Sequence, residues 1–436
     1  MTIRLVSIHH RLSNMSGFRY SEALGLVDET RACGMELILF ISEHANAAVR
    51  AALPMARPVL HCPVFRPDLS FDERTADFVA MLHQHVDPVV RKDDWVLITT
   101  GTQCEAGALA AWLGETSADR RPWAVIVFHN DRWNRGAPEE RARHAAELRV
   151  AAAEIDRLDD DAKRRLIVGA TTNELAEQLA ELLGISVRGV PLTLPSFGSS
   201  SPSSKPTDAV PLVGLLGAAR AEKGSHLIPD VIRATRRLKA IEFVVQLNNS
   251  VLPPETFAAL SRIEGELGVE VVHGPLNQEA YRTLLARCDL VLLPYERTSY
   301  RQRSSGIFIE AAMAGRPVVV PSGTWMGNLV ASGAAAGVVY EGDDPVEIAA
   351  AVLRAVDAGP DLAALARERA PEWERTMALR AFLGWLGIEI GRRAEALRRR
   401  PTLTGRIKAL VLHIIRGLLS PRTAGHRTAT DPAARR

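Results

Sequence analysis

The stretch that decides the fold is Val213-Gly214-Leu215-Leu216-Gly217-Ala218-Ala219-Arg220-Ala221-Glu222-Lys223-Gly224. It begins as a short apolar strand and continues as a loop, in which Gly217 and Gly224 permit tight turning and close backbone approach. A helix is expected to start near Gly224, and its free N–H groups attract anions. Arg220 and Lys223 add two positive charges beside it, so the loop suits a diphosphate. A surface loop with solvated charges is the alternative.

Strands and helices alternate on both sides of this loop. Strands separated by helices of about 10–15 residues indicate βαβ units and parallel sheets. The alternation stops in a Ser- and Pro-rich stretch at 196–209, which has little to bury, and then restarts. We therefore expect an α/β protein with two consecutive Rossmann-like doubly wound domains that face a cleft. Ligands of such sheets bind beyond the carboxyl ends of the strands, so the cleft is the expected active site.

The expected organisation has five parts. They are an N-terminal Rossmann-like domain at 1–195, a linker at 196–209, a second Rossmann-like domain at 210–370, a long helix at 371–400 and a basic amphipathic tail at 401–436.

Charge is distributed unevenly along the 436 residues. The net charge of +2 combines residues 391–436, which have 12 basic and two acidic groups, with a preceding part that has 41 basic and 49 acidic groups. Apolar residues at 47% and charged residues at 24% are typical of a globular chain and exclude a disordered one. Residues 404–419 form an apolar helical stripe flanked by arginines, which suits an anionic membrane surface. A helix packed on the body is the alternative; nucleic acid is not expected as a partner, because aromatic residues are scarce there.

The cysteines and the missing motifs narrow the class of protein. Cys33, Cys62, Cys104 and Cys288 are scattered, so we expect buried free thiols in a reducing compartment. No signal peptide or membrane span is expected, which favours the cytoplasm. Dinucleotide, P-loop, HExxH and GxSxG motifs are absent. Asp159-Asp160-Asp161 has a metal-binding DxD spacing, but a solvated acidic turn is favoured, and no metal site is expected.

A second informative stretch runs from Ser304 to Pro321, SSGIFIEAAMAGRPVVVP. Ser305 can cap a helix whose first turn contains Gly306, and this helix start is a second anion site. Glu310 follows about one turn later, where its carboxylate can accept hydrogen bonds from the two hydroxyls of a ribose. Simple helix–strand packing explains the alanines of this helix but not Glu310.

Together these stretches resemble the donor-binding domain of glycosyltransferase family 4, the group 1 glycosyl transferases with the GT-B fold. His273-Gly274-Pro275-Leu276 and the strand Cys288–Pro294 also match that family's pattern. The resemblance is strong over residues 210–340 and weak over 1–195. It implies an N-terminal acceptor side and a C-terminal donor side.

The resemblance also implies the chemistry. The donor would be a UDP- or GDP-linked sugar, bound as a substrate with no separate cofactor, and transfer would retain the anomeric configuration without a metal. The acceptor would be a glycan or a lipid-linked molecule, as in polysaccharide biosynthesis. Donor-binding residues implied by the family pattern are Gly217, Arg220, Lys223, Ser305, Gly306, Ile307 and Glu310.

Two positions depart from the family's pattern. Gln302 stands where the family has a Glu that contacts the donor sugar, and Ala218 stands where Arg is frequent. Arg297, Arg301 and Arg303 crowd the segment before Gly306; they favour an acidic sugar or an extra phosphate, or they are solvated.

In the N-terminal half, His129 follows an expected strand and has polar neighbours. It can bind a donor hydroxyl or assist proton transfer, although a structural role is the alternative. The catalytic candidates are thus His129, Gln302 and Glu310. A GT-B sugar-nucleotide epimerase or hydrolase, and a non-catalytic nucleotide-sugar-binding protein, are the alternative functions.

Overall fold

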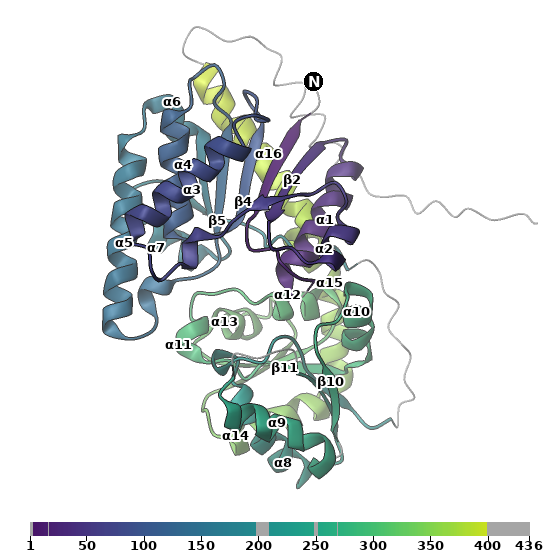
Figure 1. Cartoon of the computed structure of the whole chain (residues 1–436). Helices are drawn as coiled ribbons and strands as arrows, with labels where there is room; N and C mark the ends of the chain where they lie inside the picture. Colours follow the sequence, from purple (N-terminus) through teal and green to yellow (C-terminus); the bar gives the residue numbers. More distant parts are fainter. Residues whose placement is uncertain (1–2, 16, 198–208, 248–251, 268, 399–436) are drawn as a thin grey trace, which may run out of the picture.

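The computed structural model describes residues 3–15, 17–197, 209–247, 252–267 and 269–398. The expected tail at 401–436 and most of the expected linker at 196–209 lie outside this range. Two parallel α/β sheets form two domains, one above the other in Figure 1. This arrangement confirms the predicted fold class.

The N-terminal sheet has seven strands in the order β3-β2-β1-β4-β5-β6-β7, and all its neighbours are parallel. Its strands are β1 (Arg4–His9), β2 (Glu36–Ser42), β3 (Arg57–Leu60), β4 (Trp95–Gly101), β5 (Trp123–Phe128), β6 (Leu166–Ala170) and β7 (Val187–Gly189). Its helices are α1 (Phe18–Ala32), α2 (Ala47–Ala52), α3 (Phe71–His85), α4 (Gln103–Glu115), α5 (Pro138–Arg157), α6 (Asp160–Arg165) and α7 (Asn173–Leu183).

The C-terminal sheet has six parallel strands in the order β10-β9-β8-β11-β12-β13. Its strands are β8 (Leu212–Leu215), β9 (Glu242–Leu247), β10 (Glu270–His273), β11 (Leu290–Leu292), β12 (Val318–Pro321) and β13 (Gly337–Tyr340). The helices that follow in this half are α8 (Ile228–Arg236), α9 (Pro254–Leu267), α10 (Gln278–Arg287), α11 (Arg297–Tyr300), α12 (Gly306–Met313), α13 (Trp325–Ala331), α14 (Pro345–Asp357), α15 (Gly359–Met377) and α16 (Leu379–Arg398).

The central strands are apolar because both of their faces are covered. In β5 every residue from Trp123 to Phe128 is buried. Ile126 joins the core on the side of α3, α4 and α5, whereas Val125 joins the core on the side of α1 and α16. Continuous apolar runs of this kind are typical of parallel sheets. Because the strands are parallel, their carboxyl ends all lie at the same edge of the sheet, and the loops that follow them can place polar side chains there.

The single long helix predicted at 371–400 is wrong, because the structure contains two helices that meet at Ala378. The backbone of Ala378 is extended (φ −71°, ψ 158°), and the next amide, that of Leu379, donates to the carbonyl of Leu194 at 2.6 Å. Beyond this break α16 lies on the N-terminal sheet (Figure 1), where Phe382 and Leu386 are fully buried.

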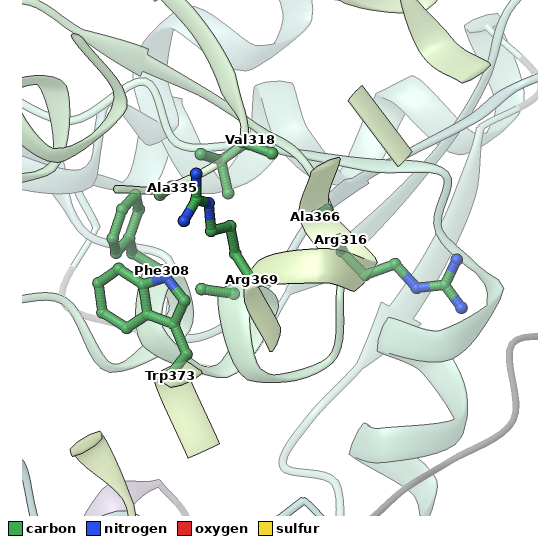
Figure 2. Close-up of a pocket in the computed structure, with 9 residues that line it drawn as sticks. Phe308, Arg316, Val318, Ala335, Ala366, Arg369 and Trp373 are labelled. Carbon is green, nitrogen blue, oxygen red and sulfur yellow. The ribbon is translucent and has the colours of Figure 1, made fainter. Parts of the chain in front are cut away.

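Helix α15 stays with the C-terminal domain. Trp373 of α15 packs edge-on against Phe308 of α12, with ring centroids 5.6 Å apart, and its indole N–H donates to the carbonyl of Ala334. Figure 2 shows these rings side by side, with Arg369 reaching toward Val318. The space among these side chains is about 10 Å³, so this region is a packed core and not a binding site.

Three other sequence expectations need adjustment. The helix expected near Gly224 begins at Ile228, because Gly224 is left-handed (φ 69°) and a short 3-10 turn intervenes. The cysteines are free, but only Cys104 and Cys288 are buried. Asp159 caps α6, and both Asp159 and Asp161 pair with Arg121, so the acidic turn is an ordered helix start.

The described residues contain no helix long and apolar enough to cross a membrane. In the same residues, no cluster of three or more His, Cys, Asp or Glu side chains is arranged to hold a metal ion.

Candidate functional site

A cavity of about 410 Å³ lies between the two domains. The N-terminal domain lines it with Arg11 after β1, with the start of α1, with Thr100 near the end of β4 and with the residues that follow β5. The C-terminal domain lines it with the loop after β8, with α10 and with the start of α12. The polar and charged lining residues are Arg11, Arg19, Ser21, Thr100, His129, Asn130, Arg220, Lys223, Gln246, Gln278, Tyr281, Arg282, Tyr300, Arg303, Ser304, Ser305 and Glu310. The cleft predicted from the sequence is therefore present and is lined by both domains.

Gly217 and Gly224 shape the loop after β8. Gly217 has φ 90°, and a Cβ on it would lie 2.2 Å from Cδ1 of Ile307. Its amide donates to Oε1 of Gln246 at 2.8 Å. A Cβ on Gly224 would lie 1.8 Å from the carbonyl oxygen of Pro294. Both positions therefore require glycine, for left-handed backbone and for close approach of neighbouring segments.

Arg220 and Lys223 bring positive charge to this loop. A guanidinium nitrogen of Arg220 lies 3.3 Å from Oε1 of Glu222. Lys223 lies with its ammonium 5.5 Å from the centre of the Tyr295 ring. Burial lowers the pKa of Lys223 to about 7, and repulsion from Arg220 adds to this effect. A bound anion would favour the charged form of Lys223 and so raise its pKa again, which makes the loop a suitable site for a negatively charged ligand.

The start of α12 forms the adjacent wall. Ser305 is buried and caps the helix, because its hydroxyl oxygen accepts the amide of Phe308 at 3.2 Å. Gly306 and Ile307 line the cavity directly. The first-turn N–H groups of a helix carry partial positive charge and bind anions well.

Glu310 is held by a neighbour that the sequence did not reveal. Its Oε2 accepts a hydrogen bond from the hydroxyl of Tyr281 on α10 at 2.7 Å, which leaves Oε1 for a ligand hydroxyl. Burial raises the pKa of Glu310 to about 7, while Tyr281 and Lys223 act in the opposite direction. Tyr281 is 29 residues away in sequence, and nothing in the pattern of α10 signals this contact.

His129 lies on the N-terminal wall, directly after β5. Burial lowers its pKa to about 4, so the imidazole is neutral at pH 7. It hydrogen-bonds the backbone of Thr99, whereas Nε2 has no partner within the described residues. If Nδ1 donates to Thr99, Nε2 is an acceptor, which suits a ligand hydroxyl.

Gln302 is not among the residues that line the cavity. Its side-chain oxygen lies 3.5 Å from the amide nitrogen of Asn134, and its backbone oxygen accepts from the Thr172 hydroxyl at 2.6 Å. The structure therefore places Gln302 in the contact between the domains. Sequence position alone did not show this, because the direction of the side chain depends on the N-terminal domain.

Arg19 and Arg282 are charged lining residues that the sequence did not single out. Arg19 belongs to the first turn of α1, and its spacing along the chain marks no motif. His9 and His10 precede it in the chain and are buried behind the cavity wall, where they contact Glu22 and Glu105.

Comparisons with known proteins agree with this architecture. Residues 210–358 match the family model described as Glycosyl transferases group 1. A search of curated proteins gave no match. Sucrose-phosphate synthase from Thermosynechococcus elongatus is similar in structure, with a TM-score of 0.62 and 15% identity over 91% of this chain and 99% of that one.

Two further solved structures are also similar. HepE from Anabaena, in complex with UDP-glucose, gives a TM-score of 0.58 and 16% identity over 92% of this chain and 100% of that one. The catalytic domain of starch synthase IV from Arabidopsis thaliana, bound to ADP and acarbose, gives a TM-score of 0.56 and 12% identity over 85% of this chain and 95% of that one. At such identities the likeness shows the fold, and it confirms the expected GT-B architecture.

Proposed function

We propose that this chain is a glycosyltransferase that uses a UDP- or GDP-linked sugar as donor, because its second domain matches the group 1 glycosyl transferases and its fold is GT-B. The observation that carries the proposal is one wall of the cavity. It combines Arg220 and Lys223, the start of α12 and the carboxylate of Glu310. The cations and the helix start suit a diphosphate, and the carboxylate beside them suits the ribose attached to it.

Each group then has a defined task in the proposal. Arg220 and Lys223 neutralise the leaving diphosphate, so that its charge develops next to fixed cations and no metal is required. Glu310 accepts a ribose hydroxyl through Oε1, while Tyr281 fixes its orientation. His129 faces the sugar from the other domain. Retention of the anomeric configuration is part of the proposal and follows from the family resemblance.

The proposed acceptor is a glycan or a lipid-linked molecule, in the context of polysaccharide biosynthesis at the cytoplasmic face of a membrane. The basic stretch at 401–436 supports this location through its charge. Flotation with anionic liposomes, with and without residues 401–436, tests it. Equal binding by both forms would contradict a membrane role for this stretch.

Calorimetric titration with UDP and GDP tests the donor site. We expect one of them to bind, and we expect Arg220→Ala and Lys223→Ala each to weaken binding by roughly tenfold or more, because a charge-assisted hydrogen bond is lost. Glu310→Ala should weaken nucleotide binding but leave pyrophosphate binding intact. Lys239→Ala, on the surface of the same domain, is the matched control.

Failure of every nucleoside diphosphate to bind would overturn the proposal. Turnover of a sugar nucleotide without transfer would favour an epimerase or a hydrolase. Tight binding without any turnover would favour a non-catalytic protein, and Gln302→Glu would then be tested for a gain of activity.

A further inference from the structure

The cavity contains more positive charge than a diphosphate needs. Besides Arg220 and Lys223, its lining includes Arg11, Arg19, Arg282 and Arg303. Among the described residues that line it, Glu310 is the single carboxylate. Unbalanced cations in a partly buried cavity are costly without an anion.

The surplus charge gathers around His129. The cations that lower its pKa are Arg19, Arg303 and Arg11, in that order. Those that lower the pKa of Lys223 are Arg220 and Arg303. Arg303 therefore acts electrostatically on both His129 and Lys223, and Arg19 acts on His129 from the N-terminal wall.

Among the described residues, Arg19 contacts no carboxylate directly. Within the described residues it makes no ion pair or hydrogen bond, and its Nε is buried without a partner. Glu22 lies nearby, but burial raises the pKa of Glu22 to about 8, so this carboxyl is mostly protonated at pH 7. Its two oxygens accept the hydroxyls of Thr99 and Thr193.

The other nearby carboxylate, Glu105, is already engaged. It accepts hydrogen bonds from Arg11, from the hydroxyl and amide of Thr102, and it contacts Nε2 of His10 at 3.1 Å. Arg11 therefore contacts a carboxylate directly, whereas Glu105 and Glu22 act on Arg19 only through space.

Helix α1 contributes to the same place. Gly17, Phe18, Arg19 and Ser21 line the cavity, so the 15-residue helix points its first turn into it. Among the described residues no side chain caps this helix, and its first turn contains no acidic residue. Its N–H groups add partial positive charge beside Arg19.

We propose that Arg19, Arg303 and the start of α1 form a second anion subsite next to His129, which binds a phosphate group carried by the acceptor. This inference rests on the proposed function, because the diphosphate of the donor occupies the Arg220 and Lys223 loop. Phosphate suits the site, since its oxygens accept hydrogen bonds from guanidinium groups and helix amides together. Because Arg19 and Arg303 come from different domains, the bound phosphate joins the two walls.

The test titrates inorganic phosphate into the full chain saturated with UDP, so that the donor site is filled. We expect phosphate to bind the loaded protein at one site and glycerol 3-phosphate to displace it, whereas glycerol does not. Arg19→Gln and Arg303→Gln should weaken phosphate binding by roughly tenfold, because each loses a charged hydrogen bond. Arg301→Gln, a neighbouring exposed arginine, should leave it unchanged.

Failure of phosphate to bind the UDP-loaded protein would overturn the subsite while leaving the donor site intact. Equal binding by wild type and Arg19→Gln, or simple competition between phosphate and UDP, would overturn it as well. If Arg19→Gln lowers the melting temperature strongly, Arg19→Lys is used instead. It keeps the charge and loses the fork of donors, so we expect an intermediate affinity.

Discussion

Lys223 combines two properties that rarely occur together, a position beside other cations and a partly buried ammonium group. Burial and Arg220 both disfavour its charged form, which is why its pKa falls from the ordinary 10.5 to about 7. Phosphate oxygens would favour the charged form again. The protonation of Lys223 and the binding of a diphosphate are therefore linked.

We expect diphosphate affinity to decrease as pH rises above about 7, by at most tenfold per pH unit. The sign follows because the free protein loses the Lys223 proton in this range, whereas the complex retains it. Calorimetry with pyrophosphate from pH 6 to 9 measures the slope.

Lys223→Arg is the control for this prediction. Arg stays charged at every pH used, and the ligand's own titration is the same for both proteins, so the difference in slope reports Lys223. Identical pH profiles for the two proteins would contradict the assignment.

The residues that the sequence proposes for donor binding lie together on one wall of the cavity, because their positions depend on local structure. Gly217, Lys223 and Ser305 follow strands or begin helices, and these are positions that short-range patterns identify. The partners of the site come from tertiary packing. Tyr281 meets Glu310 across two helices, and Gln302 turns toward Asn134 because the N-terminal domain lies there. No spacing along the chain encodes either contact.

At the scale of elements, α16 joins the end of the described chain to the opposite domain. The sequence predicts helix throughout this region, but not the break at Ala378. That break depends on the amide of Leu379, which bonds to the carbonyl of Leu194, 185 residues earlier.

Phe382→Ala should destabilise the N-terminal domain by about 3–5 kcal/mol, the usual cost of removing a fully buried phenyl ring. The ring is 0% exposed and shares a core with Leu97 and Val125. Denaturant unfolding measures the loss, and hydrogen exchange should show faster exchange in β4 and β5 than in β8.

Ile388→Ala is the matched control on the same helix, because Ile388 is 52% exposed. Faster exchange in the C-terminal sheet alone would show that α16 does not belong to the N-terminal core.

At the scale of the molecule, the two domains touch through hydrogen bonds beside the cavity. The Ser304 hydroxyl donates to the Thr171 hydroxyl at 2.8 Å, and the Thr172 hydroxyl donates to the Gln302 carbonyl. Neither Thr171 nor Thr172 lines the cavity. These contacts therefore affect how the walls meet more than what either wall binds.

Thr171→Val should destabilise the closed arrangement of the ligand-free domains by about 1 kcal/mol, which raises the ratio of open to closed molecules roughly fivefold. It keeps the side-chain shape and removes the acceptor of the Ser304 hydroxyl. Small-angle scattering should show a larger radius of gyration, while UDP affinity stays within about twofold. Thr116→Val, which loses a hydrogen bond inside one domain, should leave the radius unchanged.

The contact between Leu194 and the Ala378–Leu379 segment has a mechanical consequence. Within the part of the chain that the structure describes, the backbone passes from one domain to the other twice, and the two passages lie side by side at Leu194 and Ala378. A single connection would let the domains rotate in any direction, whereas two adjacent connections favour rotation about one hinge axis. Arg19 and Arg303 then approach each other along one arc. A cut in either passage alone would also leave the two domains attached to each other.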